Sequence, residues 1–160
     1  MTKEEYIRNL SEIEQLNRSI PMRLNAQLDL RYMDCDPGER GGDGKKARQP
    51  WAEFRFDSKD EFLNPYGAVH GGIVTAVADT ATGIALVGLR MKAVVTVDIT
   101  VSFLRSLEGK SYRVLVEFTH IGAKLASANV KIYDMGSDDL CATVMTTFMV
   151  LSDRVPGLRI

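Results

Sequence analysis

The chain has 160 residues, of which 45% are hydrophobic, and a formal net charge of -1 at pH 7. This length is enough for one domain with a sizeable core, and neither a second domain nor an internal repeat is visible. The near-neutral charge, with no Lys/Arg cluster above background, argues against nucleic acid as a partner. We therefore expect a single globular domain over residues 1–160.

The N-terminus and the cysteines indicate where the protein resides. The first residues, MTKEEY, carry no apolar run of the signal-peptide kind, and no window approaches the length of a membrane span. Cys35 and Cys141 show no metal-binding or redox spacing. We expect a cytoplasmic protein that has free thiols, no metal site and no association with a membrane.

The first 20 residues have a helical pattern. Thr2 and Glu5 form a capping box, and apolar residues recur at helical spacing from Tyr6 until Pro21 ends the pattern. An N-terminal helix over residues 1–20 is therefore predicted, packed on the sheet, with a mobile tail as the alternative. Residues 24–32 then alternate between apolar and polar side chains, which predicts a half-buried strand.

The run at residues 34–50 carries four glycines, two prolines and charges of both signs, so a flexible, solvated loop is predicted. It lacks the G-x-x-x-x-G-K-[ST] spacing of a nucleotide-binding loop, because Lys45 is followed by Lys46. Residues 51–57 return to strand alternation, with Ala52, Phe54 and Phe56 on one face.

The stretch from Asn64 to Leu86 is the organising element of the chain. Asn64 and Gly67 are turn formers, and an apolar, small-residue pattern of helical period follows. It predicts a central helix over residues 71–88, with Gly88 as its end. The helix N-terminus would present the N–H groups of Gly71 and Gly72, which stabilise developing negative charge.

Asp79 is the single acid in this stretch, and Asp is a poor residue for a helix interior. At about 100° per residue it shares a flank with Gly72, Thr75 and Gly83, away from the main apolar stripe. A carboxylate in partly apolar surroundings is costly unless it is hydrogen-bonded, and such a group suits a base or a nucleophile. Gly72 and Thr75 are predicted to contact the substrate on this flank.

Four strands are predicted after the helix. Residues 95–103 alternate most clearly, with Val95, Val97, Ile99, Val101 and Phe103 expected on the helix and Thr96 and Asp98 expected to look away from it. Alternation over residues 112–120, 124–133 and 140–151 gives the other three, with the apolar side chains of each expected to face inward. An α+β fold results, in which an antiparallel sheet wraps one long helix.

The residues Asn64, Gly67, His70, Gly71, Gly72 and Asp79 stand in the order N-x-x-G-x-x-H-G-G-x-x-x-x-x-x-D. This motif resembles the hotdog-fold acyl-CoA thioesterases of the phenylacetate-pathway (PaaI-like) type, which include thioesterase superfamily member 2. The resemblance implies a hotdog fold, acyl-CoA as substrate, and no cofactor beyond the coenzyme A of the substrate. It also implies a homodimer with joined sheets and active sites at the interface, paired into a dimer-of-dimers tetramer.

The resemblance also assigns roles to single residues. Asp79 matches the catalytic carboxylate, which activates water or attacks the thioester, and the Gly71 N–H matches the donor that polarises the carbonyl. Asn64 matches the side chain that orients the water or the thioester, and His70 the histidine that supports the oxyanion site. Thr96 matches a hydroxyl added by the partner subunit. Two further matches, Gly122 and Lys124, belong to the coenzyme A path.

Two other functions stay open at this point. One is a non-catalytic module that binds acyl-CoA or lipid, which the intact Asp79 disfavours. The other is a hydratase or dehydratase, which needs a His and an acid placed to move a proton at carbon. The second His of the chain, His120, has no hydratase motif around it. The acyl group is not predicted, since Phe54, Phe62, Tyr66, Leu86 and Met91 are equally compatible with an acyl pocket and with the core.

Overall fold

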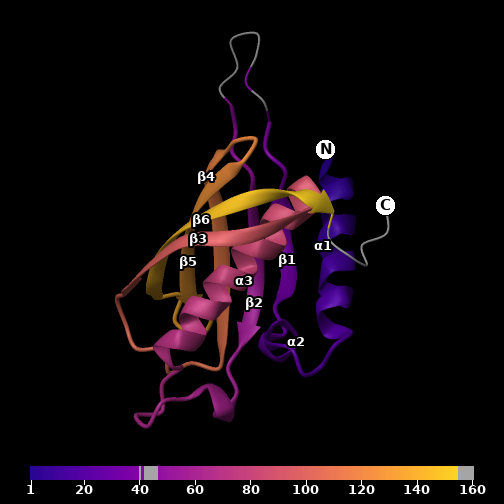
Figure 1. Ribbon diagram of the computed structural model, residues 1–160. Coiled ribbons are helices and arrows are strands. Elements are labelled where there is room, and N and C mark those ends of the chain that lie inside the picture. Colours follow the sequence, from indigo (N-terminus) through magenta and orange to yellow (C-terminus); the bar gives the residue numbers. More distant parts are fainter. Residues whose placement is uncertain (40, 42–46, 155–160) are drawn as a thin grey trace.

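The computed structural model describes residues 1–39, 41 and 47–154. One curved sheet wraps around one long helix, and a second helix lies at its side (Figure 1). The elements in chain order are α1 (Lys3–Arg18), α2 (Leu24–Leu28), β1 (Arg31–Asp36), β2 (Trp51–Asp57), the short 3₁₀ helix η1 (Asp60–Phe62), α3 (Gly71–Arg90), β3 (Lys92–Phe103), β4 (Ser111–Ile121), β5 (Leu125–Asp134) and β6 (Leu140–Arg154). The strands pair antiparallel in the order β1-β2-β4-β5-β6-β3. The predicted hotdog arrangement is confirmed.

The core lies between α3 and the concave face of the sheet. Many of the helix residues that face the sheet are small, such as Ala78, Ala81 and Ala85, and they are fully buried. Alternate side chains of the strands face them, as predicted. These inward residues are Ala52, Phe54, Phe56, Val114, Val116, Phe118, Ala126, Ala128, Val130, Ile132, Ala142, Val144, Phe148 and Val150. By length and hydropathy α3 would suffice to cross a membrane, but 56% of that window is buried inside the domain, as in the core helix of a globular protein.

The N-terminal helix α1 is docked on α3. The predicted capping box forms, with Thr2 and Glu5 each accepting a hydrogen bond from the other's backbone N–H. The Tyr6 hydroxyl donates to the carbonyl of Ala85 at 3.1 Å, and the Asn9 amide donates to that of Gly88 at 2.8 Å. These buried contacts rule out a mobile tail and make α1 one wall of the domain.

The predicted helix end at Gly88 is wrong, because α3 continues to Arg90 and ends on Met91 in the left-handed conformation, with φ 53°. Gly88 instead gives α1 room to approach. A Cβ at this position would lie 2.9 Å from Leu10 Cδ2 and 2.9 Å from Tyr6 Cε2. The glycine is therefore a packing residue inside the helix.

Because of this contact, we expect alanine substitutions at two glycines of α3 to change the free energy of unfolding in opposite directions. We expect Gly88→Ala to lower the free energy of unfolding by about 1–3 kcal/mol, since both neighbours are buried and cannot yield freely. We expect Gly83→Ala to raise it by about 0.5–1 kcal/mol, because a Cβ there meets only Phe148 at 3.8 Å. Urea unfolding of the two variants measures this difference. Equal effects in both variants would contradict the packing role of Gly88.

The strand predicted over residues 24–32 is wrong in its first half. Residues 24–28 form α2, and Asp29 ends it in the left-handed conformation, with φ 46°. The Asp29 carboxylate accepts from Arg18 at 2.7 Å and from Arg31 at 2.9 Å. These ion pairs help to fix a corner between α1 and β1. Alternation over so few apolar residues does not distinguish a strand from a short helix.

The predicted 34–50 loop begins later than expected. Asp34, Cys35 and Asp36 belong to β1, and Glu39 pairs with Arg48 through backbone hydrogen bonds of 2.8 and 3.0 Å. Residues 40 and 42–46 of this run lie outside the described residues. The connection between β1 and β2 is therefore closed at its base by the Glu39–Arg48 pair.

Strand β3 is the edge of the sheet and contains a bulge. The register with β6 shifts between Thr96 and Asp98, so that Val97 is the extra residue. Before the bulge Thr96 faces the helix, and after it Ile99 and Phe103 do. Val95 and Val97 are 45% and 54% exposed. The predicted orientation is therefore confirmed after the bulge and wrong before it, because alternation in the sequence does not reveal the extra residue.

Candidate active site

Asn64 organises the turn that leads into α3. Its side-chain oxygen accepts from the backbone N–H of Tyr66 at 2.9 Å and of Ala68 at 3.2 Å. Gly67 sits in the left-handed region with φ 84°, as a turn glycine does. The Asn64 amide nitrogen donates to no acceptor in the described part of the chain, so it remains available to a ligand.

His70 is the N-cap of α3. Its Nδ1 atom accepts from the N–H of Gly72 at 3.0 Å, and its carbonyl accepts from Ile73 and Val74. The N–H of Gly72 is therefore not free, contrary to the prediction that both glycines present donors. The Gly71 N–H makes no hydrogen bond within the described residues, and it is the donor left at the helix N-terminus.

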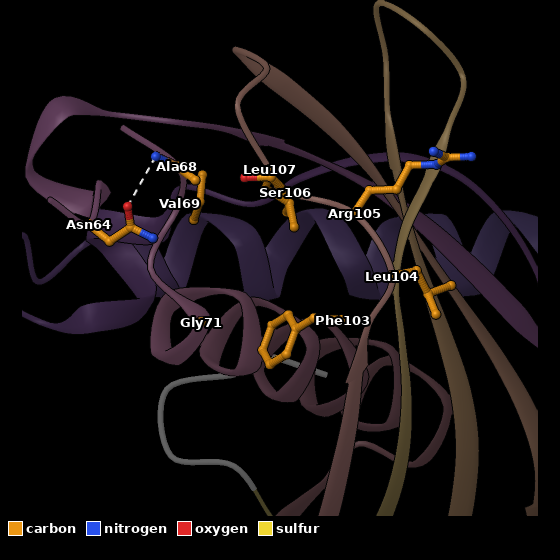
Figure 2. Close-up of a pocket in the computed structure, with 9 residues that line it drawn as sticks. All are labelled: Asn64, Ala68, Val69, Gly71, Phe103, Leu104, Arg105, Ser106 and Leu107. Atoms are coloured by element: carbon orange, nitrogen blue, oxygen red, sulfur yellow. Dashed lines mark hydrogen bonds between the residues drawn. The ribbon is translucent and has the colours of Figure 1, made fainter. Parts of the chain in front are cut away.

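A cavity of about 410 Å³ opens beside this donor (Figure 2). Asn64 and Gly71 line one side, and the segment from Phe103 to Leu107 lines the other. The Phe103 ring lies against Gly71, since a Cβ on Gly71 would be 3.1 Å from Phe103 Cζ. Sequence reasoning placed Phe103 on the helix but missed its contact with the helix N-terminus. The glycine at position 71 was the one feature of the sequence that could have indicated close approach of another side chain at this point.

Asp79 and Thr96 meet on the other half of the helix. The Thr96 hydroxyl donates to Asp79 Oδ1 at 2.6 Å within one chain. The prediction that Thr96 looks away from the helix is thus wrong. Both residues line a second cavity, of about 500 Å³, between α1, α3 and β3. The other lining residues are Ile13, Leu16, Asn17, Asn25, Thr80, Gly83, Ile84, Val87, Ala93, Val94, Val95 and Phe148.

The two predicted groups of site residues are separated within one chain. Asp79 follows Gly71 by eight residues of α3, which corresponds to about 12 Å along the helix axis. A base and an oxyanion donor must both lie within about 3 Å of the reacting group. Asn64, His70 and Gly71 therefore form one candidate half-site, and Asp79 with Thr96 forms another.

Three predicted substrate-binding residues line neither of these two cavities. The Thr75 hydroxyl donates to the Gly71 carbonyl at 2.9 Å and lines none of the cavities described above. Gly122 lies near the other end of α3, where its carbonyl accepts from Arg90 at 2.7 Å. Lys124 is exposed in the same turn. Their predicted roles in substrate binding stay predictions.

Neither cysteine is placed to act as a nucleophile. Both side chains are buried and free, and burial raises the pKa of the Cys35 and Cys141 thiols. A raised pKa disfavours the reactive thiolate. Among the described residues no three His, Cys, Asp or Glu side chains gather in a way that would hold a metal ion.

The aromatic and apolar residues that were equally compatible with an acyl pocket and with the core line neither of these two cavities. Phe54, Phe62 and Leu86 are buried in the core, and Tyr66 is 90% exposed. Met91 is the residue that ends α3. The apolar groove beside Asp79 instead takes its outer wall from α1, whose apolar stripe the sequence predicted without indicating what it covers.

Comparison with known proteins agrees with this architecture. Residues 66–141 match the model of the thioesterase superfamily. A protein of Saccharolobus solfataricus named as an esterase is 25% identical over 107 residues, which is 66% of this chain and 71% of that protein.

Solved structures give the same result over more of the chain. The PaaI protein of E. coli, from the phenylacetic acid degradation operon, superposes with a TM-score of 0.76 at 15% identity, covering 96% of this chain and 99% of that one. A thioesterase family protein of Silicibacter pomeroyi gives 0.73 at 25% identity, over 91% and 98% of the two chains. Zebrafish thioesterase superfamily member 2 gives 0.72 at 17% identity, over 89% and 98%. This chain therefore shares the hotdog fold of these proteins, and its residues 66–141 are similar to the thioesterase superfamily.

Proposed function

We propose that this protein is an acyl-CoA thioesterase that releases a free acid and coenzyme A, with Asp79 as base or nucleophile and the Gly71 N–H as oxyanion donor. The observation that carries the proposal is the Asp79–Thr96 pair at the wall of an apolar groove. A carboxylate held by a hydroxyl donor is suited to take a proton from water, and the groove is suited to an acyl chain. A hypothetical thioesterase protein from Streptococcus pneumoniae, similar in fold with a TM-score of 0.64, has been solved with coenzyme A.

In the reaction, Asp79 takes a proton from water as the water oxygen bonds to the thioester carbonyl carbon. The carbonyl oxygen gains the negative charge, which the Gly71 N–H and the Asn64 amide stabilise. The C–S bond then breaks and the acid forms. The thiolate of coenzyme A leaves with the proton that Asp79 took from water, which returns Asp79 to its carboxylate form. In direct attack, a carboxylate oxygen of Asp79 would bond to the carbonyl carbon as the C–S bond breaks and the thiolate of coenzyme A leaves, and water would then cleave the resulting mixed anhydride to the free acid and the Asp79 carboxylate. His70 positions the Gly72 N–H and hence the helix N-terminus, and the reaction needs no further cofactor.

The complete site forms between two copies of the chain in this proposal, because the two halves lie too far apart in one copy. Strand β3 is a long edge strand whose outer side has no partner strand in the described sheet, and such an edge can pair with another strand. Antiparallel pairing of two β3 strands would turn the Phe103 end of one copy toward the Thr96 region of the other. Asp79 would then act on a carbonyl held by Gly71 of the partner subunit.

Two such dimers would pair through the outer face of the sheet. This face carries a cluster of half-exposed apolar side chains on β3, β5 and β6. Val95, Met149 and Leu125 lie in one row across these strands and are 45%, 42% and 44% exposed. Val97 and Met145, at 54% and 60% exposure, extend the cluster. Exposed apolar clusters of this kind mark interfaces, and we propose the second dimer as the occupant.

The direct test of the function is thiol release from a panel of acyl-CoAs, with phenylacetyl, benzoyl, short-chain and long-chain members. Release at catalytic rates from at least one member is the expected result. Binding without release by a folded protein would support the non-catalytic module instead. Loss of substrate with the thioester intact would indicate hydration.

The two-copy site predicts that inactive variants complement each other. We expect Asp79→Asn and Asn64→Ala each to be nearly inactive alone. After they are unfolded together in equal amounts and refolded, half of the dimers are mixed, and each mixed dimer contains one intact site. The mixture should recover about one quarter of the native activity per chain, since random pairing of equal copies governs the yield. The same variants refolded separately and then combined serve as the control. No recovery from a properly mixed dimer would contradict the shared site.

A further inference from the structure

We propose that the groove between α1 and α3 is the acyl site and that Gly83 determines how large an acyl group the groove accepts. The preferred substrates are then acyl-CoAs with uncharged, apolar acyl groups of medium length. This inference rests on the proposed function, because it takes Asp79 as the group next to the reacting carbonyl. It goes further by naming the direction of the acyl chain and the residue that limits it.

Gly83 lies one helical turn after Asp79, on the same flank of α3. With the carbonyl carbon beside the carboxylate, acyl atoms beyond about the fourth carbon would lie over this turn, which is about 6 Å farther along the helix axis. A side chain at position 83 would occupy that space, whereas glycine leaves it open. The cost of a glycine inside a helix is consistent with a need for that space.

The position is also free of packing constraints, unlike Gly88. A Cβ on Gly83 would meet only Phe148 Cε1, at an ordinary contact distance of 3.8 Å. The glycine is therefore not required by close approach of another element. Its role is better explained by the groove that it lines than by the core.

The opposite wall of the groove comes from α1. Ile13 and Leu16 face α3 across it, with Phe148 of β6 and Ile84 completing an apolar lining. Ile13 and Ile84 are 5% and 7% exposed, so this wall is built into the core and does not depend on surface side chains. The volume of the groove, about 500 Å³, lies in the range of small-molecule sites.

Charge in the groove selects against one class of acyl group. Among the described residues that line it, Asp79 is the single charged side chain. An acyl group with a terminal carboxylate, such as succinyl, would enter an apolar site of like charge without a cation to pair with. Asn17 and Asn25 also line the groove, where Asn25 donates to Asn17 at 3.4 Å, and both are neutral amides.

The test compares Gly83→Leu and Leu16→Ala with the native chain in thiol release from butyryl-, octanoyl-, dodecanoyl- and succinyl-CoA. We expect Gly83→Leu to lower kcat/KM for octanoyl-CoA by about tenfold or more while butyryl-CoA changes little, because a filled pocket rejects the longer chain. Leu16→Ala should shift the preference the other way, toward acyl-CoAs longer than octanoyl. Succinyl-CoA should be a poor substrate throughout. Gln15→Ala, on the exposed side of α1, is the matched control and should leave the profile unchanged.

A second readout separates this proposal from the proposed function. Calorimetric titration of octanoyl-CoA and of free coenzyme A into Asp79→Asn, with and without Gly83→Leu, measures acyl binding without turnover. Weaker octanoyl-CoA binding on addition of Gly83→Leu, with coenzyme A binding unchanged, would support the acyl groove even if the native chain hydrolysed none of the panel. Equal loss for butyryl- and octanoyl-CoA in a folded Gly83→Leu variant would overturn the groove assignment while leaving the thioesterase function intact.

Discussion

Asp79→Asn is expected to lower kcat for the best acyl-CoA substrate by about 10³-fold, within the range found for loss of a general base. The asparagine oxygen can still accept the 2.6 Å hydrogen bond from Thr96, so the local geometry should survive while the basic group is lost. No other carboxylate lines the groove among the described residues. Steady-state thiol release measures the effect, and KM should change much less than kcat.

The control for this variant is an acid outside both halves of the site. Glu61 is exposed in η1, and Glu61→Gln should retain native activity. Thr96→Val should cost less than Asp79→Asn, because the hydroxyl positions the carboxylate and does not itself take the proton. A fully active Asp79→Asn variant would remove the base from the mechanism and point to another group.

Gly71→Pro is expected to lower kcat by about 10²–10³-fold, as removal of one oxyanion donor does elsewhere. Gly71 is the first residue of α3, where proline is well tolerated because its missing N–H has no partner within the helix. The preceding residue, His70, has φ -57° and ψ 135°, which is the extended conformation that a following proline requires. The substitution therefore deletes the N–H and keeps the helix.

Gly71→Ala is the matched control, since it adds the same Cβ but retains the N–H. That Cβ would lie 3.1 Å from the Phe103 ring, which is 54% exposed and free to shift by a few tenths of an ångström. We expect the alanine variant to keep most of its activity, with circular dichroism equal in both. If both variants lost activity equally, displacement of Phe103 would explain the loss and the donor role would be refuted.

Most of the fold could be predicted from the sequence, because long periodic patterns of apolar residues determine where the strands and the central helix lie. Alternation in β2, β4, β5 and β6 predicted their inward faces, and the helical period predicted α3. The wrong predictions are those in which contacts between distant parts of the chain determine the local structure. Gly88 looked like a helix end but is a contact with Tyr6 and Leu10, and the 24–32 run became a helix and a corner held by Asp29.

The site residues were predicted from a motif, and the geometry could be predicted only in part. The motif named Asp79 and Gly71, but it did not reveal that His70 takes up the Gly72 N–H. The bulge at Val97 reversed the expected direction of Thr96. The acyl groove was missed because its walls come from α1 and α3, which are distant in sequence. Only the folded chain brings Leu16 and Gly83 to one cavity.

The packing of α1 on α3 has a consequence for folding during synthesis on the ribosome. The contacts of Tyr6 with Ala85 and of Asn9 with Gly88 each join residues 79 positions apart. At synthesis rates of about 5–20 residues per second, the apolar stripe of α1 waits roughly 4–16 seconds before its partner helix has been made. During that interval Tyr6 and Leu10 face water or a chaperone. The outer wall of the acyl groove is thus among the first segments synthesised, and it can be seated only after α3 exists.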